Sequence, residues 1–211
     1  MDQASPQPAR PIDRVDAVVL GVTVIAFWVI AATRWDATAL WADEVWSLSA
    51  VNDLPSAIRA SNGSTIVYYG LVWLWGRAST STVWLRMLST IIATCSIVLI
   101  ALVGRRIGGR RLGRLAPALL ITSPMFLWTG TEVRGYALET VLTVAAWYAA
   151  VVACARPTAS WSRHRARWAF AALCLVGPLV HGLFPAQIVA IGCWALIGHR
   201  RESRVRMLAP G

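Results

Sequence analysis

Apolar residues occur in long blocks along the chain rather than in the one-sided stripes of a soluble amphipathic helix. A helix rises about 1.5 Å per residue, so roughly 20 residues, flanks included, cross the hydrocarbon of a bilayer. The blocks run over residues 17–33, 66–75, 83–103, 115–128, 136–155 and 168–197, and the last is interrupted by Gly177-Pro178 and His181-Gly182. The pattern predicts an all-α, polytopic transmembrane protein.

Arginine clusters indicate how this chain is oriented, because cytoplasmic loops are enriched in basic residues. Three clusters lie between or after apolar blocks, and all three face the cytoplasm only if the short block 66–75 does not cross. The clusters are Arg105, Arg106, Arg110, Arg111 and Arg114; Arg156, Arg163, Arg165 and Arg167; and Arg200, Arg201, Arg204 and Arg206. We therefore predict about six spans, at 17–33, 83–103, 115–130 and 136–155 and in two short segments that meet near His181. A re-entrant or interfacial helix at 66–75 completes the topology.

This topology divides the chain into three parts. Residues 1–14, with three prolines before Ile12, are predicted to be a disordered cytoplasmic tail, and residues 201–211 a second cytoplasmic tail. Residues 15–200 form the transmembrane part, with a large external loop at 34–82. Residues 45–61 of this loop are predicted to form an amphipathic surface helix broken at Pro55.

Composition narrows the class of protein further. The chain is 57% hydrophobic and carries a net charge of +10, and all 20 of its basic residues are arginine. We attribute this bias to GC-rich codon usage and expect a multi-pass protein of a bacterial plasma membrane. Nucleic acid is not an expected partner, because no basic run is interleaved with exposed aromatic residues. The four cysteines, which lack CxxC spacing, are expected to be small apolar residues of the core.

Two adjacent carboxylates follow the first predicted span. Asp43 and Glu44 lie between Trp41 and Trp46 in the external loop. One interpretation is a helix start, where the helix dipole stabilises carboxylates. The other interpretation is a catalytic role. Asp43 would act as a general base toward an acceptor hydroxyl, or as a metal ligand, while the tryptophans anchor the loop and stack on a sugar.

A second polar group opens the predicted span 136–155. Arg134, close to Glu132 and Tyr136, suits the phosphate of a lipid-linked substrate, because a guanidinium binds phosphate bidentately and stays charged when partly desolvated. Alternatively, Arg134 only snorkels to the interface. Glu139, one turn inside the apolar block, needs a partner or a wet cavity.

Three further residues complete the candidate set. His181 follows a predicted helix break on the external side. Arg86 opens the second span and is either a second phosphate partner or a snorkelling charge. Tyr69 belongs to an aromatic run for which an interfacial belt is the simpler interpretation. Solvated loop charges are the alternative for the polar residues that the topology brings to one membrane face, namely Asp43, Glu44, Glu132, Arg134 and His181.

The order of these features resembles the GT-C superfamily of polytopic glycosyltransferases that use polyprenyl-phosphate sugars. Within it, the chain is similar to the bacterial protein O-mannosyltransferase and aminoarabinose-transferase-like family (glycosyltransferase family 39-like). The shared features are Asp43-Glu44, the aromatic segment 66–75, the Arg-x-x-Ser run at 86–89, Gly-Arg-Arg-Ile-Gly at 104–108, Ser123-Pro124 and Glu-x-Arg-x-Tyr-Ala-Leu at 132–138. The resemblance runs from about residue 15 to 200 and concerns the N-terminal part of these longer enzymes. Residues 62–65 stand where family members usually carry a His-Pro-Pro or similar turn.

The resemblance implies a membrane glycosyltransferase, or a truncated part of one. Such an enzyme transfers a sugar, with mannose as one candidate, from a polyprenyl-phosphate donor to an extracytoplasmic protein, lipid or polysaccharide acceptor. By this resemblance Asp43 is catalytic, with Glu44 beside it, and Arg134, Tyr136 and His181 border the lipid phosphate. Arg86, Glu132 and Tyr69 are the other substrate-binding candidates. No cofactor is demanded, and a divalent metal stays open, because the acids match no standard ligand spacing.

Two other classes of function compete with this one. In a non-catalytic membrane subunit or lipid-binding scaffold, Arg134 and Arg86 would hold anionic lipid and Asp43 would cap a helix. In a small transporter, an intramembrane charge such as Glu139 would line a pathway. The gathering of polar residues at one face and the lack of an inverted repeat argue against the transporter.

Overall fold

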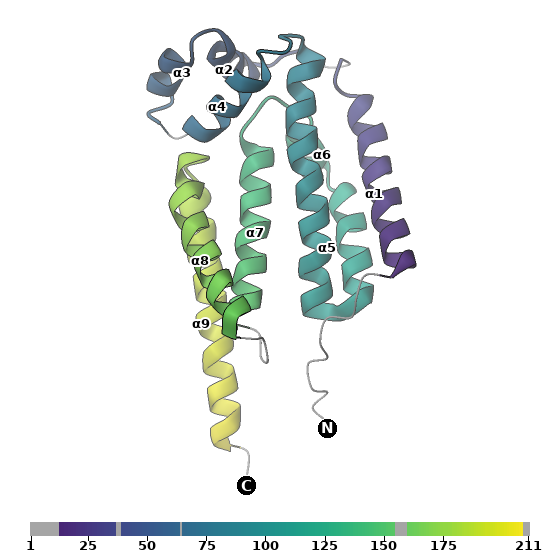
Figure 1. The fold of residues 1–211 in the computed structure, drawn as a ribbon, viewed down its shortest axis with the longest axis vertical. Helices are drawn as coiled ribbons and strands as arrows, with labels where there is room; N and C mark the ends of the chain where they lie inside the picture. The colour runs from purple at the N-terminus through teal and green to yellow at the C-terminus, as the bar shows by residue number, and fades with distance from the viewer. Residues whose placement is uncertain (1–12, 37–38, 64, 155–159, 209–211) are drawn as a thin grey trace.

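The computed structural model describes residues 13–36, 39–63, 65–154 and 160–208, and every regular element in these ranges is helical. The prediction of an all-α fold is therefore confirmed. The elements are α1 (Arg14–Ala32), α2 (Ala42–Asn52), α3 (Leu54–Ala60), α4 (Ile66–Trp75), α5 (Thr82–Ile121), α6 (Pro124–Thr129), α7 (Tyr136–Cys154), α8 (Ser160–Val176), the 3-10 turn η1 (Gly177–Leu179) and α9 (Phe184–Leu208) (Figure 1). Most of the predicted N-terminal tail, residues 1–12, lies outside the described ranges, whereas α9 continues through the second predicted tail to Leu208.

Three of the described helices, α1, α5 and α7, are long and apolar enough to cross a membrane. The outward face of α1 supports a lipid environment, because its exposed apolar side chains recur at the three- and four-residue spacing of a single helical face. These side chains are Val15, Val18, Val22, Ile25 and Val29. A continuous apolar face of this kind indicates a membrane or protein contact, so the chain has the architecture of a membrane protein.

The prediction that the four cysteines lie in the core is wrong. Cys95, Cys154 and Cys193 are exposed and Cys174 is half-buried. Lipid is as apolar as a protein core, so a small apolar side chain needs no burial against other helices.

α5 is a helical hairpin rather than one straight rod. Its helical geometry is interrupted at Gly108 and at Gly109, whose φ of +68° favours glycine. The two arms then approach closely, because a Cβ on Gly104 would lie 2.7 Å from the carbonyl oxygen of Leu112. The first arm contains the predicted span 83–103. The predicted span 115–130 is divided, because the second arm ends at Ile121, and Ser123 and Pro124 start the separate helix α6.

The start of α1 is tied to the hairpin turn by ion pairs. Asp13 and Asp16 form a capping box that begins α1. The same carboxylates pair with Arg105, Arg110 and Arg114, and the Nε atom of Arg114 lies 2.7 Å from Oδ1 of Asp16. The first predicted cytoplasmic arginine cluster therefore also holds the start of α1 against the hairpin turn of α5.

The predicted external loop folds into a layer of three short helices, α2, α3 and α4, at the opposite end of the bundle (Figure 1). The break between α2 and α3 lies at Asp53 rather than at Pro55. Asp53 caps α3 by accepting a hydrogen bond from the backbone N–H of Ser56 (3.1 Å), and proline fits in the first turn because no hydrogen bond needs its missing N–H. The ten-residue helix α4 is shorter than a bilayer span, as predicted.

Two of the contacts that hold this layer on the bundle involve apolar and aromatic side chains. The indoles of Trp75 in α4 and Trp84 in α5 stack 4.4 Å apart, and each donates its N–H to the other residue's carbonyl oxygen (2.7 and 3.0 Å). Next to them, a buried cluster joins all three helices of the layer to α5 and to the segment before α7. Its members are Ala50, Ala57, Tyr68, Tyr69, Val72, Leu85, Leu88 and Val133.

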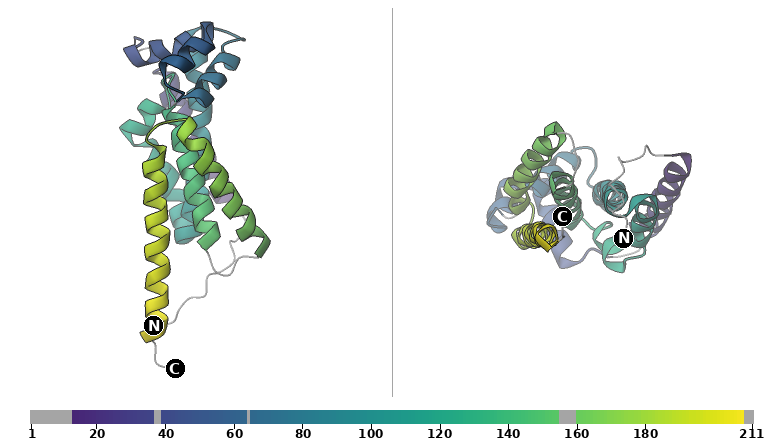
Figure 2. Two further views of the ribbon diagram at one scale, coloured as in Figure 1. Left: turned by 90° about the vertical axis from the view of Figure 1, so that its left-hand side faces the viewer. Right: turned by 90° about the horizontal axis from the view of Figure 1, so that it is seen from below.

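On the other side of the bundle, α7 lies between α5 and the pair formed by α8 and α9 (Figure 2). The two predicted short spans fall in the second half of α8 and in the apolar segment Phe184–Ala195 of α9, and neither helix is among the three described helices that are long and apolar enough to cross a membrane. The turn between α8 and α9 lies at the same end as the layer of short helices (Figure 1). His181 is thereby brought to the end that carries Asp43.

Candidate functional site

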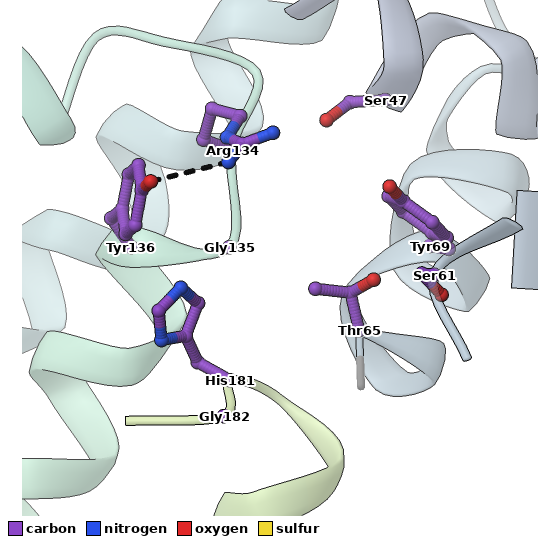
Figure 3. Close-up of a pocket in the computed structure, with 9 residues that line it drawn as sticks. All are labelled: Ser47, Ser61, Thr65, Tyr69, Arg134, Gly135, Tyr136, His181 and Gly182. Atoms are coloured by element: carbon purple, nitrogen blue, oxygen red, sulfur yellow. Dashed lines mark hydrogen bonds between the residues drawn. The ribbon is translucent and has the colours of Figure 1, made fainter. Parts of the chain in front are cut away.

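A polar cavity of about 200 Å³ lies where the short-helix layer meets the bundle. Two sets of side chains face each other across it (Figure 3). Arg134, Tyr136 and His181 come from the segment before α7, from its first residue and from the α8–α9 turn. The layer contributes hydroxyl groups from α2, from the α3–α4 connection and from α4, namely those of Ser47, Ser61, Thr65 and Tyr69.

Arg134 links the two sides of the cavity. Its Nη2 lies 3.2 Å from Oδ2 of Asp43 and donates to the Tyr136 hydroxyl at 3.1 Å, while its Nη1 donates to the Asp43 carbonyl oxygen at 3.1 Å. The guanidinium also lies 5.1 Å from the centre of the Tyr136 ring. The Asp43 side chain retains 39% of its exposure and the Arg134 side chain 20%, so both are within reach of a solute.

Beneath this pair lies a second, fully buried ion pair. Arg86, 1% exposed, donates from Nε and Nη2 to the two carboxylate oxygens of Glu44 at 3.0 and 2.7 Å. Oε1 of Glu44 also accepts the backbone N–H of Val133 at 3.0 Å, and Nη1 of Arg86 donates to the carbonyl oxygen of Trp35 at 2.9 Å. The pair thus joins α2, α5 and the segment next to Arg134.

His181, in the turn between α8 and α9, contacts a polar network formed by Glu139 of α7 and Gln187 of α9. Its Nδ1 lies 3.2 Å from Oε2 of Glu139 and 3.3 Å from the backbone nitrogen of Leu183, so a protonated Nδ1 pairs with the carboxylate and an unprotonated one accepts from the backbone. Gln187 donates to Oε1 of Glu139 at 2.7 Å. Glu139 therefore has the partners that its position in an apolar helix requires.

The predicted site residues fall into two groups. Arg134, Tyr136, His181 and Tyr69 line the cavity, and Asp43 contacts it through Arg134. Glu44 and Arg86 lie buried behind it and pair with each other, and Glu132, 8% exposed, accepts a hydrogen bond from the Trp41 indole at 3.1 Å. Asp43 and Glu44 also stand in the first turn of α2, as the helix-start interpretation requires.

Three residues whose hydroxyl groups line the cavity, Ser47, Ser61 and Thr65, were not among the predicted site residues. Ser47 could have been found from the sequence, because it follows Asp43 by four residues and residues i and i+4 of a helix share a face. Nothing comparable marked Ser61 and Thr65, because their positions depend on how α3 and α4 are joined. No group of three or more described histidine, cysteine, aspartate or glutamate side chains could hold a metal ion.

Glu132 makes the stability of the folded chain depend on pH. Burial, and then the nearby Glu44 carboxylate, raise the pKa of Glu132 to about 7. The folded chain therefore holds a proton on Glu132 that the unfolded chain releases near pH 4.5, so stability falls as the pH rises from about 4.5 to about 7. We expect the wild type to lose up to about 3 kcal/mol over this range relative to Glu132→Gln. Thermal unfolding in detergent at pH 5 to 8 measures the difference, and parallel curves for the two proteins would contradict the assignment.

Comparison with models of protein families, with curated proteins and with solved structures found no match. The basis for a functional assignment is therefore the chemistry of the cavity and of the residues around it.

Proposed function

We propose that the chain is a membrane glycosyltransferase, or the N-terminal part of one, that uses a polyprenyl-phosphate sugar as donor. The observation that carries the proposal is the Asp43–Arg134 ion pair at the edge of a polar cavity. A base for the acceptor and a cation for the leaving phosphate are the two charges that such a transfer needs. The surrounding hydroxyl and aromatic groups suit a sugar.

The proposed reaction is an inverting displacement. The carboxylate of Asp43 takes the proton of the acceptor hydroxyl, whose oxygen attacks the anomeric carbon of the sugar. The bond from this carbon to the phosphate oxygen breaks with its electron pair, and the polyprenyl phosphate leaves with an additional negative charge. The guanidinium of Arg134 stabilises this charge, and the polar cavity holds both reactants in place.

This chemistry requires the Asp43–Arg134 pair to open. In an inverting displacement the base and the leaving group stand on opposite sides of the anomeric carbon, whereas the two side chains lie 3.2 Å apart without substrate. The donor phosphate can replace Asp43 on the guanidinium, because phosphate is also a bidentate partner for arginine. Donor binding would thereby release Asp43 to act as the base.

The remaining candidates take different roles in this proposal. Tyr136 and His181 border the donor phosphate beside Arg134, and Tyr69 contacts the sugar. Glu44 and Arg86 act as positioning residues that hold the start of α2 against the segment carrying Arg134. In the proposed topology six segments cross the membrane, and the cavity faces the extracytoplasmic side, where the acceptor is available.

Sugar transfer in membranes that contain the chain tests the proposal. A radiolabelled polyprenyl-phosphate sugar is supplied, and the wild type is compared with Asp43→Asn at matched expression. The control is Asp36→Asn, which removes an exposed carboxylate from the same connecting region. We expect transfer by the wild type and the control and its loss in Asp43→Asn.

Two other outcomes separate the competing functions. If the wild type binds the donor without transferring its sugar, and Arg134→Gln weakens this binding, the chain is a lipid-binding scaffold or an incomplete enzyme. If the wild type does not bind the donor, the glycosyltransferase proposal fails.

A further inference from the structure

A second, larger cavity of about 570 Å³ lies between α5, α7 and α8. Its volume is in the range of ligand-binding cavities. Its lining residues are Leu99 and Arg106 of α5, four residues within 145–152 of α7 and five residues within 162–173 of α8, and none of them lines the polar cavity. Arg106 stands two residues before the hairpin turn of α5, and α8 begins near the same end of the bundle (Figure 1). The two cavities therefore lie toward opposite ends of the molecule.

The lining of this cavity changes from polar to apolar along the helices. Arg106 of α5 and Arg165 and Ser162 of α8 stand at the end near the hairpin turn. Leu99 of α5 and Leu173 of α8 lie seven or eight residues away, which is about 10 Å along a helix. Between them the wall is formed by four alanines together with Tyr148 and Val152 of α7, so most of the side chains around the space are small.

The charged residues that line the polar end of this cavity, Arg106 and Arg165, are both positive. None of the residues that line the cavity is acidic. Within the part of the chain that the structure describes, neither Arg106 nor Arg165 forms an ion pair, and both side chains are exposed. Arg106 differs in this from Arg105, Arg110 and Arg114 of the same α5 cluster, which pair with the aspartates at the start of α1.

We propose that this cavity binds an anionic phospholipid, with the phosphate headgroup at Arg106 and Arg165 and an acyl chain along the apolar wall. Two guanidinium groups at the membrane surface provide charge-assisted hydrogen bonds to a phosphate. Basic pockets between transmembrane helices on the cytoplasmic side are typical sites for anionic lipid headgroups. The polar-to-apolar direction of the lining matches a lipid whose chain points into the membrane. This site is independent of the proposed donor site.

Lipid binding by the purified full chain in detergent tests this inference. Phosphatidylglycerol and phosphatidylcholine with identical acyl chains are titrated, and bound lipid is measured by native mass spectrometry. We expect a preference for phosphatidylglycerol that falls about tenfold or more in Arg106→Gln/Arg165→Gln, since two charged hydrogen-bonding groups are lost. The matched control is Arg77→Gln, an exposed arginine between α4 and α5 that lies over the Trp73 ring. It should leave the preference unchanged.

A second variant tests the apolar part of the cavity. Ala145→Phe fills space without changing charge and should also weaken binding of phosphatidylglycerol. Equal binding of the two lipids by the wild type would overturn the inference, as would an unchanged preference in the double arginine variant. Full competition by inorganic phosphate, with no effect of Ala145→Phe, would likewise overturn it, because the site would then bind an anion without a chain. A dimer that binds no lipid would show that another copy of the chain covers the cavity instead.

Discussion

Arg86→Ala is expected to destabilise the folded chain by about 3–5 kcal/mol, because it leaves the buried Glu44 carboxylate without its counter-charge. The change also removes the hydrogen bond to the Trp35 carbonyl oxygen. Glu44 is fully buried, so water cannot replace the guanidinium without opening the contact between α2 and α5. Thermal unfolding and the yield of folded protein in detergent measure the effect.

The control for this prediction is Arg77→Ala, which removes an exposed arginine and should change stability little. The double variant Glu44→Gln/Arg86→Met is the stronger test, since it removes both charges together. Replacing a whole buried ion pair is often far less costly than breaking it, so the double variant should recover part of the lost stability. If Arg86→Ala unfolds at the wild-type temperature, the pair does not hold the layer on the bundle.

Arg134→Gln is expected to reduce sugar transfer by roughly 10²–10³-fold, the usual cost of losing one group that stabilises charge in a transition state. In the proposed reaction the guanidinium holds the donor phosphate and then the charge that develops on it. Arg134→Lys keeps the charge but loses the bidentate geometry, so its activity should lie between those of the wild type and Arg134→Gln. Transfer and donor binding are measured separately with the labelled donor.

The control is Arg59→Gln, which removes an exposed arginine from α3 that donates to Ser56. The separate measurement of donor binding distinguishes two roles of Arg134. If the arginine serves only as the partner of Asp43, Arg134→Gln will bind the donor normally. If it holds the phosphate as proposed, binding will weaken together with transfer, whereas Asp43→Asn will lose transfer and keep binding.

The sequence by itself determined the helical architecture and much of the polar site. Long apolar blocks have one stable solution in a membrane, namely helices whose backbone groups bond internally. Three long apolar helices agree with this, and the hairpin of α5 turns at two glycines that lie between the second and third predicted spans. The convergence of Asp43, Arg134 and His181 at one end also followed from folding the blocks back and forth.

Only the tertiary structure decided which charges are paired. Asp43 and Glu44 are neighbours in α2, but successive residues of a helix point about 100° apart, so Asp43 reaches Arg134 at the edge of the cavity whereas Glu44 points into the interior. Which one is buried depends on how the layer of α2, α3 and α4 is placed on the bundle, and the resulting Glu44–Arg86 pair joins residues 42 positions apart. Arg86 and Arg134 looked equivalent as phosphate partners in the sequence, yet only Arg134 lines the cavity.

The second cavity could not be predicted from the sequence either. The alanines of α7 and Ala169 of α8 were visible as parts of apolar blocks, but an apolar block does not reveal which face meets another helix and which leaves a gap. Arg106 and Arg165 were interpreted only as topology signals, because a local pattern cannot distinguish a paired arginine from one beside an open cavity. Local chemistry specifies helices and their ends, whereas the packing of distant segments specifies partners and cavities.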